Sequence, residues 1–320
     1  MEQMDGLTRR LLDEARLSHG DVEVAGSPRR LSVAVADLAD SQEDLESRIK
    51  GPPAKQAYDE EGHPTQAAEG FARARGLAVV ELEVEEVGGA EYVFATVKEK
   101  GRTAAEVLPD LIAELAASIE WPKSMRWGTG TTRFSRPVRW LMALLDDEII
   151  PVTFAELKAD RITRAHRFVS PPLIELDFAK NYGKAMAAGR VVVDPGQRGQ
   201  LITTGLRAFA DEEGVEVVVH DKTFREVVNL VEWPTVSMGR FDEEFLEVPR
   251  DVLETAMESH QRYFPVQDAD AKLVAAFVVV HDGDPSRTEE IVAGHERVLR
   301  ARLADAAFFY REDTARPLEE

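Results

Sequence analysis

The 320-residue chain contains no cysteine, which excludes a disulfide framework and any thiolate metal site. It also lacks a run of the roughly 20 consecutive apolar residues that a membrane-spanning helix needs. The first ten residues are polar and charged and do not have the pattern of a signal peptide. We therefore expect a cytoplasmic protein that has no membrane partner.

Several motifs of nucleotide binding and catalysis are absent as well. The sequence has no P-loop, no G-x-S-x-G nucleophile motif and no H-E-x-x-H zinc motif. His281 and Asp282, with Asp284 close by, could suggest a metal phosphohydrolase, but further ligands have no recognisable spacing. A turn after a strand is the better interpretation. We predict no catalytic residue and no metal ligand in this chain.

The net charge of −20 argues by itself against nucleic-acid binding, because phosphate contacts need a basic surface. The charge is unevenly distributed, however. Residues 121–170 hold nine Lys and Arg and five Asp and Glu, a net charge of +4, so the remainder carries −24. No acidic residue lies between Glu120 and Asp146. This window could hold an anionic partner, or its cations could pair with acidic neighbours inside the fold.

Apolar periodicity in the first half of the chain predicts helices and strands in alternation. Residues 7–16 have the pattern of a helix, followed by a β-hairpin, whereas residues 40–64, rich in Gly, Pro and acidic residues, have that of a connection. Thr103 and Glu106 have capping-box spacing ahead of an apolar helix. Pro109 suggests that this helix starts later than the box indicates.

The second half has the same mixed character. Residues 138–145 are strongly apolar and predict a strand, and the near-continuous apolar run at 273–280 predicts a central strand. Ser286 and Glu289 again have capping-box spacing, before a long amphipathic helix that extends toward Tyr310. Mixed elements of this kind predict an α+β fold with largely antiparallel sheets flanked by helices.

The length suggests two or three small domains, at a prior of roughly 150 residues per domain. We predict a helix-plus-hairpin unit at 1–60. An α+β domain with a basic-aromatic segment follows at 61–172, and an α+β domain ending in a long helix at 173–320.

Cationic and aromatic side chains alternate within 121–140. Guanidinium groups bind phosphates or stack on bases, and tryptophan stacks. Alternatively, Trp127, Phe134 and Trp140 belong to the core and the arginines cap or pair locally. A second basic cluster follows at 161–167 and could join the same surface. The candidates for contacts with nucleic acid or a protein partner are Lys123, Arg126, Trp127, Arg133, Arg136, Arg139, Arg164 and Arg167.

His260 and Gln261 are two further candidates. His260 falls on the apolar face of the helix predicted after Pro249, and Gln261 is followed by Arg262 and an aromatic pair. A buried histidine usually makes a hydrogen bond within the core, but such side chains can also read or stack on RNA bases.

A collinear series of segments resembles one protein family. It includes Pro-Lys-Ser-Met-Arg-Trp-Gly at 122–128, Phe-Ser-Arg-Pro-Val-Arg-Trp at 134–140 and Met-Glu-Ser-His-Gln-Arg-Tyr-Phe at 257–264, with others at 27–31, 51–52, 67–73, 164–168, 231–234 and 300–309. In this order the segments resemble the β chain of the two-subunit bacterial glycyl-tRNA synthetase. The set is specific because it covers nearly the whole chain.

The resemblance implies a role in ATP-dependent attachment of glycine to tRNA(Gly). In this family the α subunit carries the catalytic core, so ATP and Mg are expected there and no cofactor is expected in this chain. The implied partners are the α subunit, tRNA(Gly) and a second β chain in an α2β2 assembly. The implied function is non-catalytic tRNA binding; the alternative is an assembly module that docks the α subunit without touching tRNA.

The chain departs from the family pattern at both ends. Family members open with a strand that carries an Ile-Gly-Thr-Glu-Glu-Leu-Pro-like motif, which is missing here, and this sequence corresponds to about the first half of a member. The first domain is therefore expected to lack a strand, and the family's downstream helical and anticodon-binding domains are not included.

Overall fold

A computed structural model describes residues 1–169 and 171–315. The chain forms two compact units. The smaller unit contains Gln3–Val22 and Ala34–Glu120, and the larger unit contains Met1–Glu2, Glu23–Val33 and Trp121–Glu320. The domain boundaries proposed from the sequence remain predictions.

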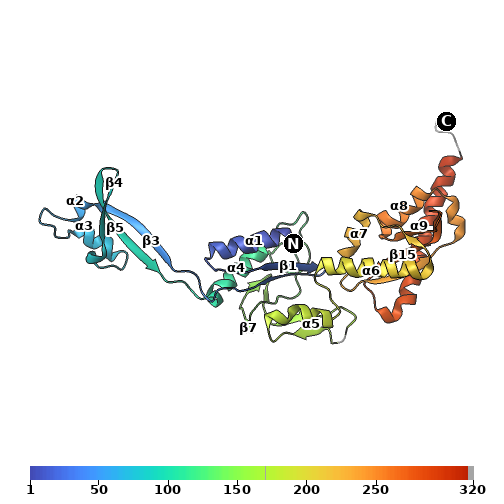
Figure 1. Cartoon of the computed structure of the whole chain (residues 1–320), viewed down its shortest axis with the longest axis horizontal. Helices are drawn as coiled ribbons and strands as arrows, with labels where there is room; N and C mark the ends of the chain where they lie inside the picture. Colours follow the sequence, from blue (N-terminus) through green and yellow to red (C-terminus); the bar gives the residue numbers. More distant parts are fainter. Residues whose placement is uncertain (170, 316–320) are drawn as a thin grey trace. The chain divides into compact units, whose positions relative to one another are not determined.

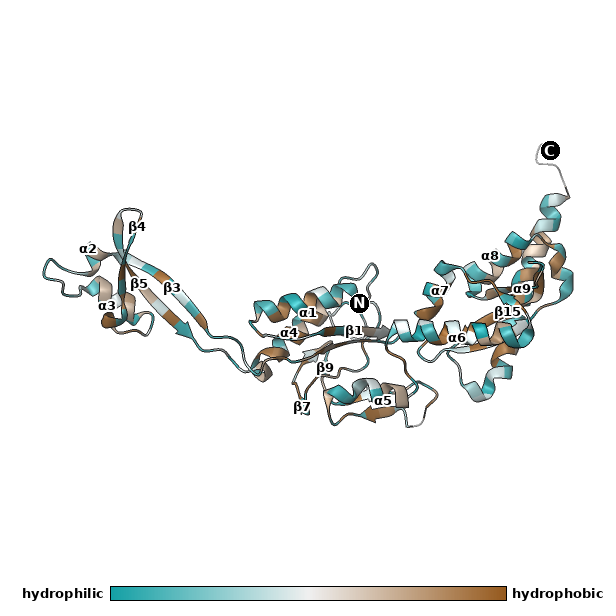
Figure 2. Ribbon diagram, viewed as in Figure 1, coloured by the Kyte–Doolittle hydropathy of each residue, from teal (hydrophilic) through white to brown (hydrophobic). Residues whose placement is uncertain are grey.

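Most elements of the smaller unit lie in its second segment. In chain order the elements are α1 (Glu2–Glu14), β3 (Leu45–Pro53), α2 (Ala54–Ala57), α3 (Gln66–Arg73), the 3-10 helix η1 (Val79–Glu81), β4 (Glu83–Val87), β5 (Ala90–Glu99) and α4 (Ala104–Ser118). Apolar and polar residues alternate along α1 (Figure 2), and Thr8, Leu11 and Leu12 are its buried residues. Helix α1 begins earlier than predicted, at Glu2.

The interpretation of residues 40–64 as a connection is wrong in its central part, because strand β3 runs through it. Strand β3 pairs with β5 in an antiparallel ladder from Leu45 to Lys50. Gly51 then packs closely against α3, since a Cβ at this position would come within 2.6 Å of the Phe71 ring. The Gly-Pro-Pro sequence therefore marks close helix packing and a register shift rather than a turn.

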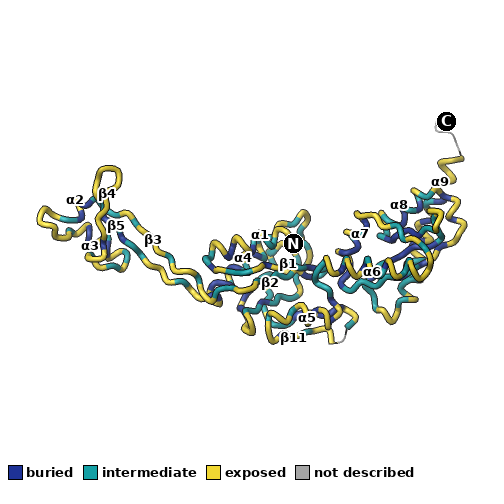
Figure 3. Tube along the Cα trace, in the orientation of Figure 1, coloured by how far each residue is buried: buried dark blue, intermediate teal, exposed yellow. Residues whose placement is uncertain are grey.

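The sheet of the smaller unit has the order β3-β5-β4, with β5 central. Its core packs the small side chains of α2 and α3, together with Leu82 after η1, against β5. The core residues are Ala57, Ala68, Ala72, Leu82, Val93 and Ala95. All of β4 is exposed (Figure 3), including its two valines, Val84 and Val87. Apolar residues in this edge strand therefore do not indicate a covered face.

The predicted capping box at the start of α4 is present. The Glu106 carboxylate accepts hydrogen bonds from the backbone N–H and the hydroxyl of Thr103, each at 2.9 Å. The expected later start is wrong, because α4 begins at Ala104 with Pro109 inside it. The proline removes one helical hydrogen bond, and burial of five apolar residues of α4 offsets this loss.

The larger unit contains many short elements before a regular C-terminal half. They are β1 (Val22–Ser27), β2 (Arg30–Val35), β6 (Leu144–Leu145), β7 (Glu148–Ile149), β8 (Thr153–Phe154), β9 (Leu157–Lys158), β10 (Ile162–Arg164), β11 (Leu173–Glu175), η2 (Ala179–Asn181), α5 (Tyr182–Ala188), α6 (Pro195–Glu213), β12 (Glu216–Val217), α7 (Asp221–Val228), β13 (Thr235–Arg240), η3 (Glu243–Glu247), α8 (Arg250–Gln261), β14 (Phe264–Gln267), β15 (Leu273–His281), η4 (Pro285–Arg287) and α9 (Thr288–Thr314).

The C-terminal half of this unit is a three-layer sandwich. Its antiparallel sheet has the order β12-β14-β15-β13, with α6 and α7 on one face and α8 and α9 on the other (Figure 1). Along β15, Ala276 and Val278 face the first helix pair, whereas Phe277 and Val279 face the second. Both faces of β15 are covered, which explains its continuous apolar run. The α+β prediction is confirmed, as is the central position of this strand.

The second predicted capping box is wrong. Asp284, not Ser286, provides the cap, because its carboxylate accepts the Ser286 backbone N–H at 3.0 Å at the start of η4. Helix α9 then begins at Thr288 directly after this turn. Pro285 favours the extra turn because its fixed φ suits the first position of a helix.

The predicted strand at 138–145 is also wrong except at Leu144–Leu145. Aromatic side chains on both sides of this segment form a packed cluster. The Trp121 and Phe134 rings lie 4.7 Å apart, and Phe154 lies 6.0 Å from Phe134. No helix in the described part of the chain combines the length and apolarity required to cross a membrane.

Candidate nucleic-acid interface

The interior of the larger unit contains a buried ionic network around Glu232. The Glu232 carboxylate, whose side chain is 1% exposed, accepts hydrogen bonds from the Ser27 hydroxyl at 2.5 Å and the Arg30 Nε at 3.0 Å. Arg29 donates to it through Nε at 2.8 Å and Nη2 at 2.5 Å. We call Ser27, Arg29, Arg30 and Glu232 the Glu232 network. It ties the β1–β2 turn to the segment before β13.

The same arginines reach a third segment. Arg29 donates to the Ala165 carbonyl at 3.2 Å, and Arg30 donates to the Arg164 carbonyl at 2.9 Å. The backbone around Glu232 is held from the other side by Asp282, whose carboxylate accepts the N–H groups of Glu232 and Trp233 at 2.8 Å each. The His166 Nε2 lies 3.2 Å from the same carboxylate.

These interactions determine the ionisation of Glu232. Burial alone would raise the pKa of Glu232, but the Arg30 charge and the hydrogen bonds from Ser27, Arg29 and Arg30 outweigh it and lower the pKa below its usual value. The pKa of Asp282 is also lowered: burial opposes this, and hydrogen bonds from His166 and from the Trp233 and Glu232 backbones prevail. Both carboxylates are therefore charged at neutral pH, and their hydrogen bonds hold separate segments of the larger unit together.

The lowered pKa values predict a loss of stability in acid. A carboxyl group with a depressed folded pKa contributes stability that is fully present above its unfolded pKa, about 4 for Glu and Asp. That contribution is lost as pH falls through the lower folded pKa. We expect the free energy of unfolding, measured with urea at a series of pH values, to fall below about pH 4. Replacing Glu232 with Gln should flatten this fall. An equally steep fall in the variant would contradict the assignment.

His281 and Asp282 do not form a metal site with their neighbours. Asp282 is used by the hydrogen bonds described above, and the His281 Nε2 lies 3.2 Å from the Ser237 hydroxyl. The other ring nitrogen of His281 accepts the Gly283 N–H. Among residues 1–169 and 171–315, no group of three or more His, Asp or Glu side chains is placed to hold a metal ion.

The cations predicted from the sequence lie on the outside of the larger unit. We define the cationic surface as the seven exposed residues Lys123, Arg126, Arg133, Arg136, Arg139, Arg164 and Arg167. In the described residues, none of the seven has a carboxylate oxygen within 4.0 Å. The ion pairs with acidic neighbours that the sequence left open are therefore not formed by these seven residues in the described part of the chain, although Arg133 donates through Nε to the Ser124 hydroxyl at 3.2 Å.

Two members of the cationic surface are anchored to the Glu232 network. Arg136 donates through Nη1 to the Pro28 carbonyl at 3.2 Å, in the β1–β2 turn. The Arg164 guanidinium lies 5.7 Å from the centre of the Trp140 ring, and the Arg30 guanidinium lies 5.5 Å from the same ring. The buried network thus places cations from two separate segments around one turn.

The aromatic candidates have different surroundings. Phe134 packs in the aromatic cluster and is half-buried. Trp127 and Trp140 are half-buried. Phe168, which is not among the predicted contacts, is 54% exposed, and its ring lies 5.5 Å from that of His166. An exposed aromatic next to Arg167 is suited to stacking on a base. In the sequence, its position directly after an arginine could have marked Phe168 as a candidate contact.

His260 and Gln261 lie at the end of α8. His260 is exposed, so its expected place on the apolar face of the helix is wrong, and Gln261 is half-buried. His260 lines a hollow together with Arg302, Asp305 and Phe309 of α9. In the part of the chain that the structure describes, no hydrogen bond or ion pair joins these two residues to the cationic surface.

The fold and the surface define an α+β protein that presents a group of exposed cations despite its negative net charge. The family described as "Glycyl-tRNA synthetase beta subunit" matches residues 1–320, and the chain belongs to this family.

Relatives from three bacteria give the same result. The chain is similar to the glycine–tRNA ligase beta subunit of Moorella thermoacetica, with 45% identity over 99% of this chain and 46% of the relative. That of Clostridioides difficile is 40% identical over 100% of this chain and 46% of the relative. That of Myxococcus xanthus is 44% identical over 98% of this chain and 44% of the relative. The chain spans less than half the length of these curated relatives.

Proposed function

We propose that this chain is a tRNA-holding part of a glycine–tRNA ligase, and that it binds tRNA(Gly) through the cationic surface. One observation carries the proposal. In a protein of net charge −20, seven exposed cations lie without a carboxylate within 4.0 Å among the described residues. Unneutralised cations on one surface attract phosphate, whatever the sign of the whole protein.

Three exposed arginines elsewhere in the chain are paired with carboxylates. Arg48 lies 3.0 Å from Glu83, Arg287 lies 2.5 Å from Glu290, and Arg300 lies 3.1 Å from Asp242. Paired arginines of this kind attract a phosphate less strongly, because a carboxylate already balances their charge. Among the described residues, arginines without a carboxylate neighbour also occur elsewhere, for example Arg207 and Arg297. The cationic surface differs from these in the number of such cations that a single stretch of the chain, residues 123–167, supplies.

The catalytic step belongs to another chain in this proposal. The relatives are named as beta subunits, which implies a second kind of subunit, and we propose an α subunit that binds ATP and Mg and attaches glycine. The sequence of this chain contains no phosphate-cradling glycine motif. A second β chain would complete an α2β2 assembly.

An assembly module is the second candidate function. Helix α9 exposes two neighbouring aromatic side chains, Phe308 at 58% and Phe309 at 63%, and aromatic residues are enriched at protein interfaces. In this case the chain docks the α subunit, and tRNA is held by the part of the β subunit that lies outside this span.

The salt dependence of binding separates the two candidates. Arg126, Arg139 and Arg167 are exposed and make no side-chain hydrogen bond or ion pair within the described residues, so replacing all three with Gln leaves the fold intact. We expect the slope of log affinity for tRNA(Gly) against log salt to become shallower by roughly two to three, about one for each phosphate that is no longer neutralised. Fluorescence titration at several salt concentrations measures it.

A matched control removes the same charge from paired positions. The variant with Arg48, Arg287 and Arg300 all replaced by Gln should keep the wild-type slope, because these side chains are balanced by carboxylates. Equal slopes for the wild type, the cationic-surface variant and the control would show that tRNA does not bind at the cationic surface. Binding to the α subunit without any affinity for tRNA would favour the assembly module.

A further inference from the structure

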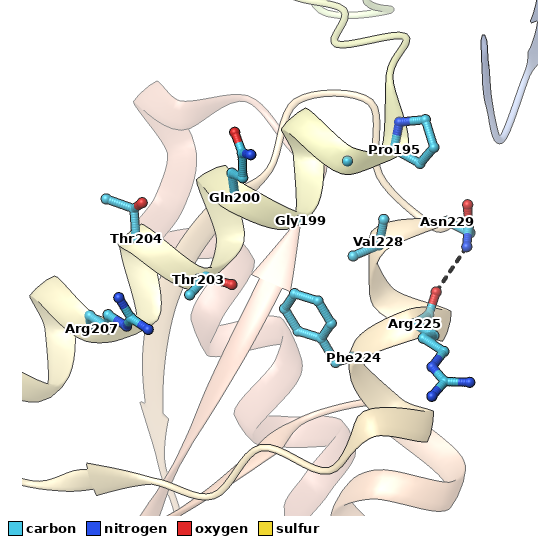
Figure 4. A pocket seen from close by; sticks show the side chains of 11 residues that line it. Pro195, Gly199, Gln200, Thr203, Thr204, Arg207, Phe224, Arg225, Val228 and Asn229 are labelled. Carbon is cyan, nitrogen blue, oxygen red and sulfur yellow. Dashed lines mark hydrogen bonds between the residues drawn. The ribbon is translucent and has the colours of Figure 1, made fainter. Parts of the chain in front are cut away.

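A groove of about 620 Å³ lies between α6 and α7, away from the cationic surface in sequence (Figure 4). Helix α6 contributes Gln200, Thr203, Thr204 and Arg207 to its lining, and α7 contributes Phe224 and Arg225. Gly196 and Gly199 leave the α6 wall without side chains over its first turns. The groove is therefore a trough along one helix and not a closed cavity.

No acidic residue of the described chain lines this groove, although the protein carries a net charge of −20. Arg207 has no carboxylate within 4.0 Å among the described residues. Arg225 lies 3.5 Å from Asp221, with both side chains more than three-quarters exposed, so water screens this pair and it holds the arginine weakly. Both guanidinium groups are available to an anion.

The remaining groups suit a nucleic-acid strand. Gln200, Thr203 and Thr204 carry amide and hydroxyl groups that can donate to phosphate and ribose oxygens. The Phe224 ring points into the groove (Figure 4) and offers an aromatic surface to a base. An isolated small molecule is usually bound in an enclosed pocket, whereas an open trough with an arginine on each wall matches a continuous backbone.

We propose that the α6–α7 groove is a second RNA site, which holds an unpaired segment of the same tRNA through Arg207 and Arg225. This inference rests on the proposed function, because it assumes that the chain binds tRNA. It adds an RNA-binding site on the sandwich half of the larger unit, apart from residues 121–170. The occupant is single-stranded because only unpaired bases are free to stack on a ring such as Phe224.

Replacing Arg207 and Arg225 together with Gln tests the proposal. The control replaces Arg297 and Arg311 of α9 with Gln, which removes the same charge from two exposed helical arginines outside the groove. We expect the groove variant to bind tRNA(Gly) roughly tenfold more weakly than the control at about 0.15 M salt, with a slope shallower by roughly one to two. A single-stranded RNA oligonucleotide should show the same loss, and a duplex RNA should not.

The outcomes separate this inference from the proposed function. A loss in the cationic-surface variant with none in the groove variant overturns the groove and leaves the function standing. A loss only in the groove variant supports the groove and overturns the cationic surface. In a third outcome, the groove variant loses binding of inorganic phosphate or of a mononucleotide but keeps its affinity for RNA. The groove is then a small-anion site, and the inference is overturned. If the double variant does not fold, Thr204→Glu at an exposed groove position replaces it.

Discussion

Replacing Glu232 with glutamine is expected to lower the free energy of unfolding of the larger unit by about 3–5 kcal/mol, the usual cost of breaking a buried ion pair from one side. The variant keeps the shape of the side chain but leaves the buried Arg30 and the partly buried Arg29 without their shared negative charge. An uncompensated buried guanidinium is more costly than the loss of one hydrogen bond. Urea unfolding at pH 7 measures the effect, with Trp233 next to the site as a fluorescence probe.

The control for this variant is a carboxylate of the same type on the surface. Glu290 lies 2.5 Å from Arg287, but the two side chains are 69% and 62% exposed. Replacing Glu290 with Gln should change stability by less than about 1 kcal/mol, because exposed ion pairs contribute little. If Glu232→Gln were as mild as this control, the network would not be a principal source of stability.

The Glu232 network also shows which features a sequence cannot reveal. Its members come from residues 27–30 and 232, and its neighbours from 164–166 and 282. No spacing rule links positions so far apart, since only the tertiary fold brings them together. The one local signal was Glu232 itself, a single acidic residue between Val231 and Trp233, because a charge among apolar residues is often a buried and paired one.

Elements with strong periodicity were predictable. The continuous apolar run of β15 needs two covered faces, and the capping box of α4 is a local hydrogen-bond pattern. Strand β3 escaped prediction because Gly51 and the prolines after it suggest a turn, and only the Phe71 ring packed against Gly51 explains them. Features that depend on nearby residues can be predicted from the sequence. The role of a residue such as Gly51, which depends on contact with a residue distant in the sequence, cannot.

The candidate site was partly predictable for the same reason. Counting charges located the basic window, but a count does not distinguish a free arginine from one that is held internally. Arg161 lies within the window, yet it donates to the Leu176 and Asp147 carbonyls. Arg139 lies in the same window and is exposed without an ion-pair partner among the described residues. The difference depends on where the backbone carbonyls lie, which the sequence does not give.

Replacing Arg198 with methionine is the second change expected to have a large effect. Arg198 is fully buried on α6, and its guanidinium donates to four carbonyls at 2.7–3.0 Å, those of Gly26, Val192, Val193 and Val228. Burial lowers its pKa, and nearby carboxylates oppose that shift. Methionine has a similar length but no donor, so two buried and two partly buried carbonyls lose a partner. We expect the free energy of unfolding to fall by about 3–5 kcal/mol.

Two comparisons make this prediction specific. Arg207→Met on the exposed side of the same helix should stay within about 0.5 kcal/mol of wild type, and Arg198→Lys should fall between the two, because an ammonium group reaches fewer of the carbonyls. A loss of stability in Arg198→Met as small as that in Arg207→Met would mean that water replaces the guanidinium as hydrogen-bond donor. Because Arg198 holds the Gly26 carbonyl beside Ser27, it supports the same turn as Glu232. The double variant Glu232→Gln, Arg198→Met should therefore lose less stability than the two single losses added together, since residues of one network are not independent.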